Sequence, residues 1–268
     1  MENTSQQKKC CKVIATYFGA RRGYPKDCND TIEMLTTEIE NEAVIENGFD
    51  TDVVIVNHDF GNKKAIDFLS KYNGQKTQNG RIIVLHRPYD DGRGLSFASF
   101  MYAFDILKAD YDYWFFNEDD IYAMEPGYIK RMIDLLDSDD DVAYVCAEKL
   151  VSHPHNVVDG YIESTGHEHL PPHAHGGVGL TATKYILEVI DKLGEFPLPK
   201  LKMSKELQSA AIGGDFNIFK TEEGIKWYRD AELNGEVAFT NCYTNIGYKL
   251  KLGSEGRSFF RVQTQEYC

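Results

Sequence analysis

Short apolar runs alternate with amphipathic segments between Lys12 and Cys146, and this alternation restricts the fold more than any other feature of the sequence. The runs have strand length, whereas the segments between them repeat apolar residues at helical spacing. The expected strands are Lys12–Phe18, Asp52–Asn57, Arg81–His86, Asp112–Asn117 and Val142–Cys146. The expected helices are Asn29–Asn47, Lys63–Tyr72, Leu95–Leu107 and Gly127–Leu136. This order predicts an α/β fold with a mostly parallel sheet, flanking helices and ligands beyond the carboxyl ends of the strands.

The rhythm changes after Lys149, where a stretch rich in His, Pro and Gly begins. Helices are expected over Thr181–Leu193 and Lys205–Thr221, with a last strand or two between Val237 and Leu252. We therefore expect a second half of a different kind, rather than more doubly wound sheet. No linker composition separates the halves, so the sequence predicts a single domain over residues 1–268, with halves at 12–149 and 150–252 and a tail at 253–268.

Charge and composition exclude several classes of protein. The net charge of −13 repels polyanions and argues against a nucleic-acid partner. No apolar run approaches the roughly 20 residues of a membrane span, and the first residues lack the pattern of a signal peptide. The six cysteines form no zinc or disulfide pattern. A cytoplasmic protein with no membrane span is the expectation.

The segment YWFFNEDDIYAME places Glu118, Asp119 and Asp120 directly after a buried aromatic strand. If the chain stays extended, Glu118 and Asp120 point to the same side and share one hard cation, Mn²⁺ or Mg²⁺, with the phosphates of a ligand. The alternative is a solvated acidic turn that caps the next helix.

The run FFNEDD with its following Pro-Gly resembles the Asp-x-Asp region of GT-A glycosyltransferases, particularly the large inverting family two. The resemblance implies a GT-A, Rossmann-like fold with a donor-binding first half and an acceptor-binding second half. It also implies that Asp120 binds the metal and that Glu118 faces the ribose or shares the metal.

Further segments follow in the order that this resemblance implies. TYFGARR resembles the loop that holds the nucleotide base, HRPYDDGRG the region before the third helix, and HAHGGVGLTATKYI the turn that lines the donor sugar. The donor-binding residues implied are Thr16, Tyr17, Arg21, Asn57, Asp59, Arg93, Glu118, Asp119, Gly176 and Gly177. In AAIGGDFNIF, Asp215 stands where the family has its general base, and the alternative is a helix cap.

The resemblance implies a metal-dependent transferase that moves a sugar from a nucleotide-diphosphate sugar to a glycan or other hydroxyl acceptor, with inversion. Two alternatives remain open. Six of the eight histidines lie between His153 and His175, which favours a zinc-dependent hydrolase. A catalytically silent nucleotide-sugar-binding domain is the other.

Overall fold

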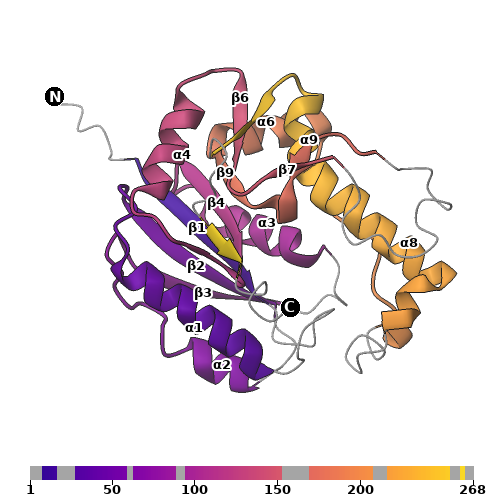
Figure 1. Cartoon of the computed structure of the whole chain (residues 1–268), viewed down its shortest axis with the longest axis horizontal. Coiled ribbons are helices and arrows are strands. Elements are labelled where there is room, and N and C mark those ends of the chain that lie inside the picture. Colours follow the sequence, from indigo (N-terminus) through magenta and orange to yellow (C-terminus); the bar gives the residue numbers. More distant parts are fainter. Residues whose placement is uncertain are drawn as a thin grey trace.

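The computed structural model describes residues 8–16, 28–58, 63–88, 94–152, 169–207, 216–253 and 260–262. Its main feature is a seven-stranded sheet in the order β10-β6-β9-β4-β1-β2-β3 (Figure 1). The strands of this sheet are β1 (Cys10–Thr16), β2 (Thr51–His58), β3 (Ile82–Arg87), β4 (Tyr113–Glu118), β6 (Val142–Cys146), β9 (Gly179–Ala182) and β10 (Lys249–Leu252). In this sheet β9 is antiparallel to both neighbours, and every other pairing is parallel. The expected α/β fold with a mostly parallel sheet is confirmed.

Helices flank this sheet, and shorter elements connect them. The helices are α1 (Cys28–Val44), α2 (Lys63–Leu69), α3 (Leu95–Leu107), α4 (Tyr128–Asp137), α6 (Thr183–Leu193), α8 (Glu222–Asp230) and α9 (Ala238–Asn245). The shorter elements are β5 (Ile121–Ala123), β7 (Leu150–Val151), β8 (His173–Ala174), β11 (Phe260–Val262), the 3₁₀-helices η1 (His175–Gly177) and η2 (Phe216–Lys220), and the π-helix η3 (Ala231–Val237). β5 pairs with β11, and β7 pairs with β8. Among the described residues, no helix is both long enough and apolar enough to cross a membrane.

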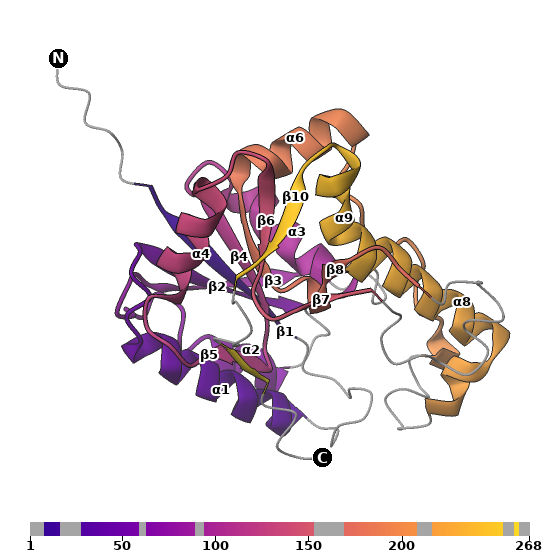
Figure 2. The ribbon, with the colours of Figure 1, turned by 45° about the horizontal axis from the view of Figure 1, so that its top comes forward.

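The sheet is covered on both faces because successive side chains of a strand point in opposite directions. In β1, Ile14 packs with residues of α1 and α2, whereas Val13 and Ala15 join the larger cluster that includes α3. Figure 2 shows α1 and α2 beside β1, β2 and β3, with α8 on the other side of the molecule. Burial on both faces explains why β1 and β2 read as continuous apolar runs.

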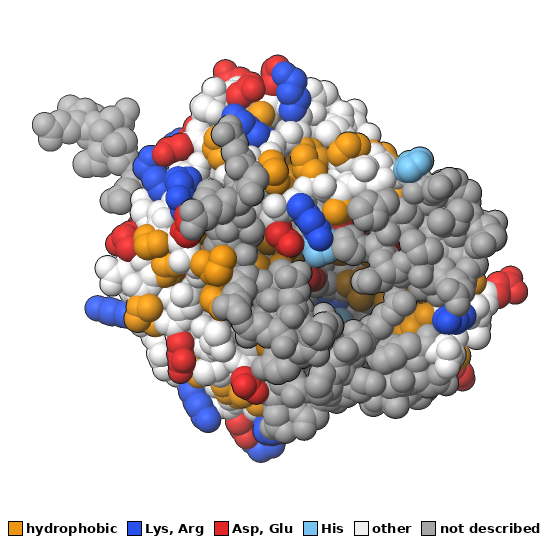
Figure 3. All heavy atoms as spheres, viewed as in Figure 1, with side chains coloured by type: hydrophobic (Ala, Val, Ile, Leu, Met, Phe, Trp, Pro, Cys, Tyr) orange, Lys and Arg blue, Asp and Glu red, His pale blue; other side chains and the backbone are white. Residues whose placement is uncertain are grey.

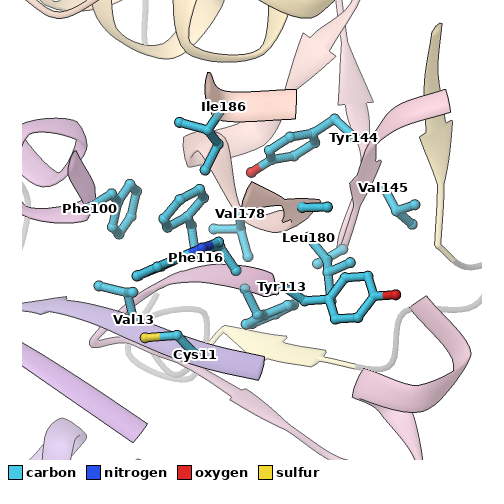
Figure 4. Close-up of a cluster of buried hydrophobic side chains, with 14 of the residues drawn as sticks. Cys11, Val13, Phe100, Tyr113, Phe116, Tyr144, Val145, Val178, Leu180 and Ile186 are labelled. Atoms are coloured by element: carbon cyan, nitrogen blue, oxygen red, sulfur yellow. The ribbon is translucent and has the colours of Figure 1, made fainter. Parts of the chain in front are cut away.

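The larger cluster joins side chains from both halves of the chain. Figure 4 shows Val13 of β1, Phe100 of α3, Phe116 of β4, Tyr144 of β6 and Ile186 of α6 in this core. The rings of Phe100 and Phe116 stack with their centroids 5.0 Å apart. These shared contacts bind the early strands to the later helices, so the position of each half depends on the other.

The second half was expected to depart from the doubly wound pattern, yet two of its strands join the same sheet. β9 lies between β4 and β6, and β10 extends the edge beyond β6. The sequence GLTA of β9 is only four residues long and buried throughout, so it carries no alternating pattern. Its antiparallel pairing is decided by the gap between β4 and β6, which only the folded chain provides.

The expected elements of the second half are present with different extents. A strand between Val237 and Leu252 is confirmed by β10, whereas α9 occupies most of the residues before it, because Phe239 and Tyr243, four residues apart, both pack into the core. In the described part of the expected helical segment Lys205–Thr221, residues 205–207 are helical and η2 ends at Lys220, after which Thr221 caps α8. The helix Leu95–Leu107 and the strand Val142–Cys146 are confirmed with their bounds.

Candidate functional site

The carboxyl ends of β1 and β4 meet at the point where the strand order reverses. From β1 the chain moves outward to β2 and β3, then returns to place β4 on the other side of β1. Open α/β sheets bind their ligands beyond the strands at such a point. Thr16 ends β1 and Glu118 ends β4, one register position apart, since Ala15 is the partner of Glu118. Thr16 is 3% exposed, and its Oγ1 makes no hydrogen bond in the described part of the chain.

We call the segment of Glu118, Asp119 and Asp120 the acidic turn. Only Glu118 still belongs to β4 and follows the alternation of its side chains. Glu118 points toward α3, where Ser96 Oγ donates to Glu118 Oε1 at 2.7 Å. The chain then turns at Asp119 and Asp120 instead of staying extended, so the expected alternation of these two residues is wrong. Asp119 is fully buried and Asp120 half-buried. Glu118 therefore reaches the reversal point by strand geometry, whereas the turn sets the directions of the other two.

Asn117 closes the base of the acidic turn. Its side chain points to the opposite face from Glu118, and its Nδ2 donates to the Ile121 carbonyl at 2.7 Å and to Glu38 of α1. The bond to Ile121 spans the turn from one end to the other. Because Asn117 is fully buried, this amide fixes the turn without access to solvent.

A buried polar network of Lys12, Glu38, Glu42, Asn117 and Tyr128 lies beneath the acidic turn. Lys12 Nζ lies 2.9 Å from Glu38 Oε1 and 2.8 Å from Glu42 Oε1, and Tyr128 donates to Glu42 Oε1 at 2.7 Å. Burial raises the pKa of Glu38 to about 8 against the opposing effect of Lys12. One ammonium faces two buried carboxylates, so a proton on Glu38 leaves the network neutral.

The Gly-Gly turn that the sequence indicated lies against the acidic turn. Gly176 and Gly177 have φ angles of 59° and 67°, which favour glycine. A Cβ on Gly176 would lie 3.3 Å from Glu118 Oε2, and one on Gly177 would lie 2.8 Å from Phe97 Cε1. Glycine is therefore required here both by the backbone and by the close approach of Glu118 and Phe97.

Three further groups, here called the His-Glu group, gather next to this turn: His173, Glu232 and Glu236. One potential ligand atom from each lies within 4.8 Å of the others. Gly176 N–H donates to Glu236 Oε1 at 2.8 Å, so Gly176 contacts both Glu118 and Glu236. Burial raises the pKa of Glu236, and the nearby Glu118 carboxylate acts in the same direction. Sequence reasoning missed both glutamates, because they lie about 60 residues after His173 in an unremarked acidic helix.

The two histidines of His173-Ala174-His175 have different partners. His173 Nδ1 lies 2.8 Å from the Pro171 carbonyl, whereas His175 Nδ1 lies 2.9 Å from Glu148 Oε2. Burial lowers the pKa of His175, but the Glu148 hydrogen bond and charge outweigh it and raise the pKa above its ordinary value. Only His173 belongs to the His-Glu group. His169 is exposed, and His153, His155 and His167 lie outside the described residues.

The remaining expected site residues divide into two sets. Asn57 is buried at the end of β2, where its Nδ2 lies 3.1 Å from His86 Nδ1 of the neighbouring strand. Its amide is thus engaged within the sheet. The others lie outside the described residues: Tyr17, Arg21, Asp59, Arg93 and Asp215.

Figure 3 shows a hollow on the same face as Figure 1, with acidic, basic and His side chains visible around it.

No protein-family model matches this chain. A search of curated proteins also gave no match.

Proposed function

We propose that the protein is a GT-A type, metal-dependent glycosyltransferase that moves a sugar from a nucleotide-diphosphate sugar to an acceptor hydroxyl. The observation that carries this proposal is the position of Glu118. It stands at the carboxyl end of β4, at the reversal of strand order, where Ser96 holds one carboxylate oxygen and Gly176 lies against the other. The mostly parallel seven-stranded sheet with flanking helices is compatible with the Rossmann-like fold of this class.

The acidic turn suits a divalent cation that a ligand's phosphates would complete. Mg²⁺ and similar ions bind through one or two protein carboxylates together with substrate phosphates. Glu118 and Asp120 offer two carboxylates, and within the described residues neither belongs to a group of three metal-ligating side chains. When bound, the cation would offset the charge of the departing diphosphate.

Each of the chain's own residues has one task in this reaction. Glu118 and Asp120 would hold the cation, and Thr16 offers a buried hydroxyl at the end of β1. The absence of a side chain at Gly176 leaves Glu118 accessible to a ligand. Asp215 takes the proton of the acceptor hydroxyl while that oxygen bonds to the anomeric carbon and the bond to the diphosphate oxygen breaks. This displacement inverts the configuration.

The first prediction concerns Asp120→Asn, which removes one carboxylate charge without changing the size of the side chain. We expect affinity for nucleotide diphosphates in Mn²⁺ to fall by about 100-fold, the upper range for perturbing a metal's surroundings. The measurement is calorimetric titration of UDP, GDP, CDP and ADP with and without Mn²⁺. Donor hydrolysis under the same conditions separates a transferase from a silent binder, because only an active enzyme releases the diphosphate.

Asp134→Asn is the matched control, since Asp134 is an exposed acid that pairs with Lys130 at 2.6 Å on α4, where it takes no part in the site. This variant should bind nucleotide diphosphates as the wild type does. Unchanged Mn²⁺-dependent affinity in Asp120→Asn would contradict the proposed cation site. Absence of binding by the wild type for all four nucleotides would contradict the transferase itself.

A further inference from the structure

The geometry points to a second divalent metal site, for a transition-metal ion such as Zn²⁺ or Mn²⁺, formed by His173, Glu232 and Glu236. This site does not depend on the proposed transferase activity, and its ligands differ from those of the acidic turn. It joins β8, which carries His173, to η3, which carries both glutamates.

The burial and the tautomer of His173 support this site. The side chain is fully buried, and its Nε2 makes no hydrogen bond in the described part of the chain. A carbonyl oxygen only accepts hydrogen bonds, so the contact between Nδ1 and the Pro171 carbonyl places the ring hydrogen on Nδ1. In that tautomer, Nε2 carries a lone pair. A buried lone pair without a donor is costly unless a cation completes it.

The potential ligand atoms also lie close enough together to share one ion. Two atoms bound to one ion at about 2.1 Å lie roughly 3.0 to 4.2 Å from each other, depending on the coordination angle. The potential ligand atoms of His173, Glu232 and Glu236 all lie within 4.8 Å of one another. Small side-chain movements would therefore bring all three onto one ion.

Hydrogen bonds that orient the ligand side chains also support this site. Metal-binding imidazoles donate their other N–H to a carbonyl or carboxylate, and metal-binding carboxylates accept further hydrogen bonds. His173 has the Pro171 carbonyl as this partner, and Glu236 has the Gly176 N–H at 2.8 Å. His173 and Glu236 are thus already oriented from behind.

The helix η3, which carries both glutamates, also supports this site. Glu232 and Glu236 lie four residues apart in η3, a seven-residue π-helix. π-helices are rare and concentrate at functional sites, and their wider turn keeps positions four apart on one face. Glu232 is 4% exposed, so the chain places its carboxylate in the interior beside a second acid. A cation would offset the repulsion between them.

The ligand set also selects the ion. Mg²⁺ prefers oxygen ligands alone, whereas imidazole nitrogen suits Zn²⁺ and other transition metals. We therefore expect Zn²⁺ to bind far more tightly than Mg²⁺. Comparable affinity for the two ions would overturn ligation by His173.

The second prediction tests this site with Zn²⁺ alone, in the full chain after chelation and without nucleotide. Without a nucleotide, no phosphates are present to complete a site at the acidic turn. Calorimetry and metal analysis should give one tightly bound ion per chain. His173→Gln, Glu232→Gln and Glu236→Gln should each lower affinity by about 100-fold or more, since they remove a ligand and not merely its support.

Two matched controls should retain wild-type affinity: His169→Gln, an exposed histidine four residues before His173, and Glu148→Gln, the partner of His175. Asp120→Asn should also bind Zn²⁺ as the wild type does. Circular dichroism of the metal-free variants checks folding, and Glu236→Gln, which is partly exposed, keeps the test valid if His173→Gln does not fold.

The proposal is overturned if the wild type binds no Zn²⁺, or if His173→Gln and Glu236→Gln bind it as the wild type does. It is likewise overturned if Asp120→Asn alone abolishes binding, because the ion then belongs to the acidic turn. If the wild type binds Zn²⁺ but transfers no sugar, that result would instead count against the proposed function. The two failures are therefore distinguishable.

Discussion

The acidic turn and the His-Glu group both lie next to Gly176, yet the chain builds them in different ways. The acidic turn comes from three consecutive residues at the end of one buried strand. The His-Glu group joins side chains from β8 and η3 that are about 60 residues apart in sequence. Both place carboxylates next to the same glycine, so Glu118 and Glu236 influence each other electrostatically.

The support of the two regions differs as well. Beneath the acidic turn, Lys12 provides a buried positive charge for Glu38 and Glu42. The His-Glu group contains two acids and an imidazole whose Nε2 has no partner in the described part of the chain. The first region thus contains a buried cation of the protein's own, whereas the second is where we propose that a metal ion binds. The next predictions test this distinction.

The largest effect is expected for Lys12→Met, which leaves the buried acidic side chains of Glu38 and Glu42 without their ammonium. Removing one partner of a buried ion pair costs about 3 to 5 kcal/mol of unfolding free energy. Urea denaturation at neutral pH measures it.

Lys63→Met is the control, because Lys63 and Asp67 form an exposed pair on α2 with Nζ 2.8 Å from the carboxylate. Its cost should stay below about 0.5 kcal/mol. Similar losses in the two variants would show that Lys12 contributes no more than a surface lysine. The proposed support of the acidic turn would then be wrong.

Gly177→Ala should come next, with a loss of about 2 to 4 kcal/mol. The new Cβ would meet Phe97 at 2.8 Å and Phe239 at 3.1 Å, and the positive φ adds its own strain. Thermal and urea unfolding measure the loss. Because Gly177 adjoins Gly176, we also expect nucleotide and Zn²⁺ affinity to fall together.

Gly194→Ala isolates the contribution of the backbone. Gly194 has a φ of 84°, but nothing lies within 4 Å of the position of its Cβ. It should lose about 1 to 2 kcal/mol and keep both affinities. If the two alanine variants lose equally, crowding against the aromatic core does not set the geometry between the two regions.

The smallest effect is the pH dependence due to Glu38. Its pKa is about 8 in the folded protein and lies near 4.5 in the unfolded chain, so the folded state holds a proton that the unfolded state releases. The contribution of Glu38 to the free energy of unfolding is therefore fully present below pH 4.5 and declines as the pH rises toward 8. Between pH 6 and 8 we expect a loss of about 2 kcal/mol at most.

Glu38→Gln removes this titration while keeping the size of the side chain. The variant should show a flatter dependence of unfolding free energy on pH over the same range, measured by urea denaturation at several pH values. Equal slopes in the wild type and the variant would mean that Glu38 is already ionised in the folded protein. The charge balance assigned to the buried polar network would then need revision.

Local pattern was sufficient for much of the first half of the fold. The helix Leu95–Leu107 and the strand Val142–Cys146 have the expected bounds, because apolar spacing within a short window determines which face is buried. The place of Glu118 followed from the same logic, since an acid directly after a buried strand lies at a carboxyl end of the sheet. These features depend on residues close together in the sequence.

Tertiary structure decided what depends on distant neighbours. Phe239, Thr240 and Tyr243 favour a strand by propensity, yet α9 forms there because Phe239 and Tyr243 pack on the core. β9 enters the sheet between two strands that precede it in the chain.

The His-Glu group shows the same limit at the level of a site. Neither glutamate has a sequence signal that relates it to His173, because their proximity arises only when η3 packs against β8 and η1. Sequence determined where the first carboxylate of the acidic turn would lie, since its direction follows from a single strand. Only the folded chain could bring His173, Glu232 and Glu236 together, because packing between distant segments, and not local pattern, sets the distances among their side chains.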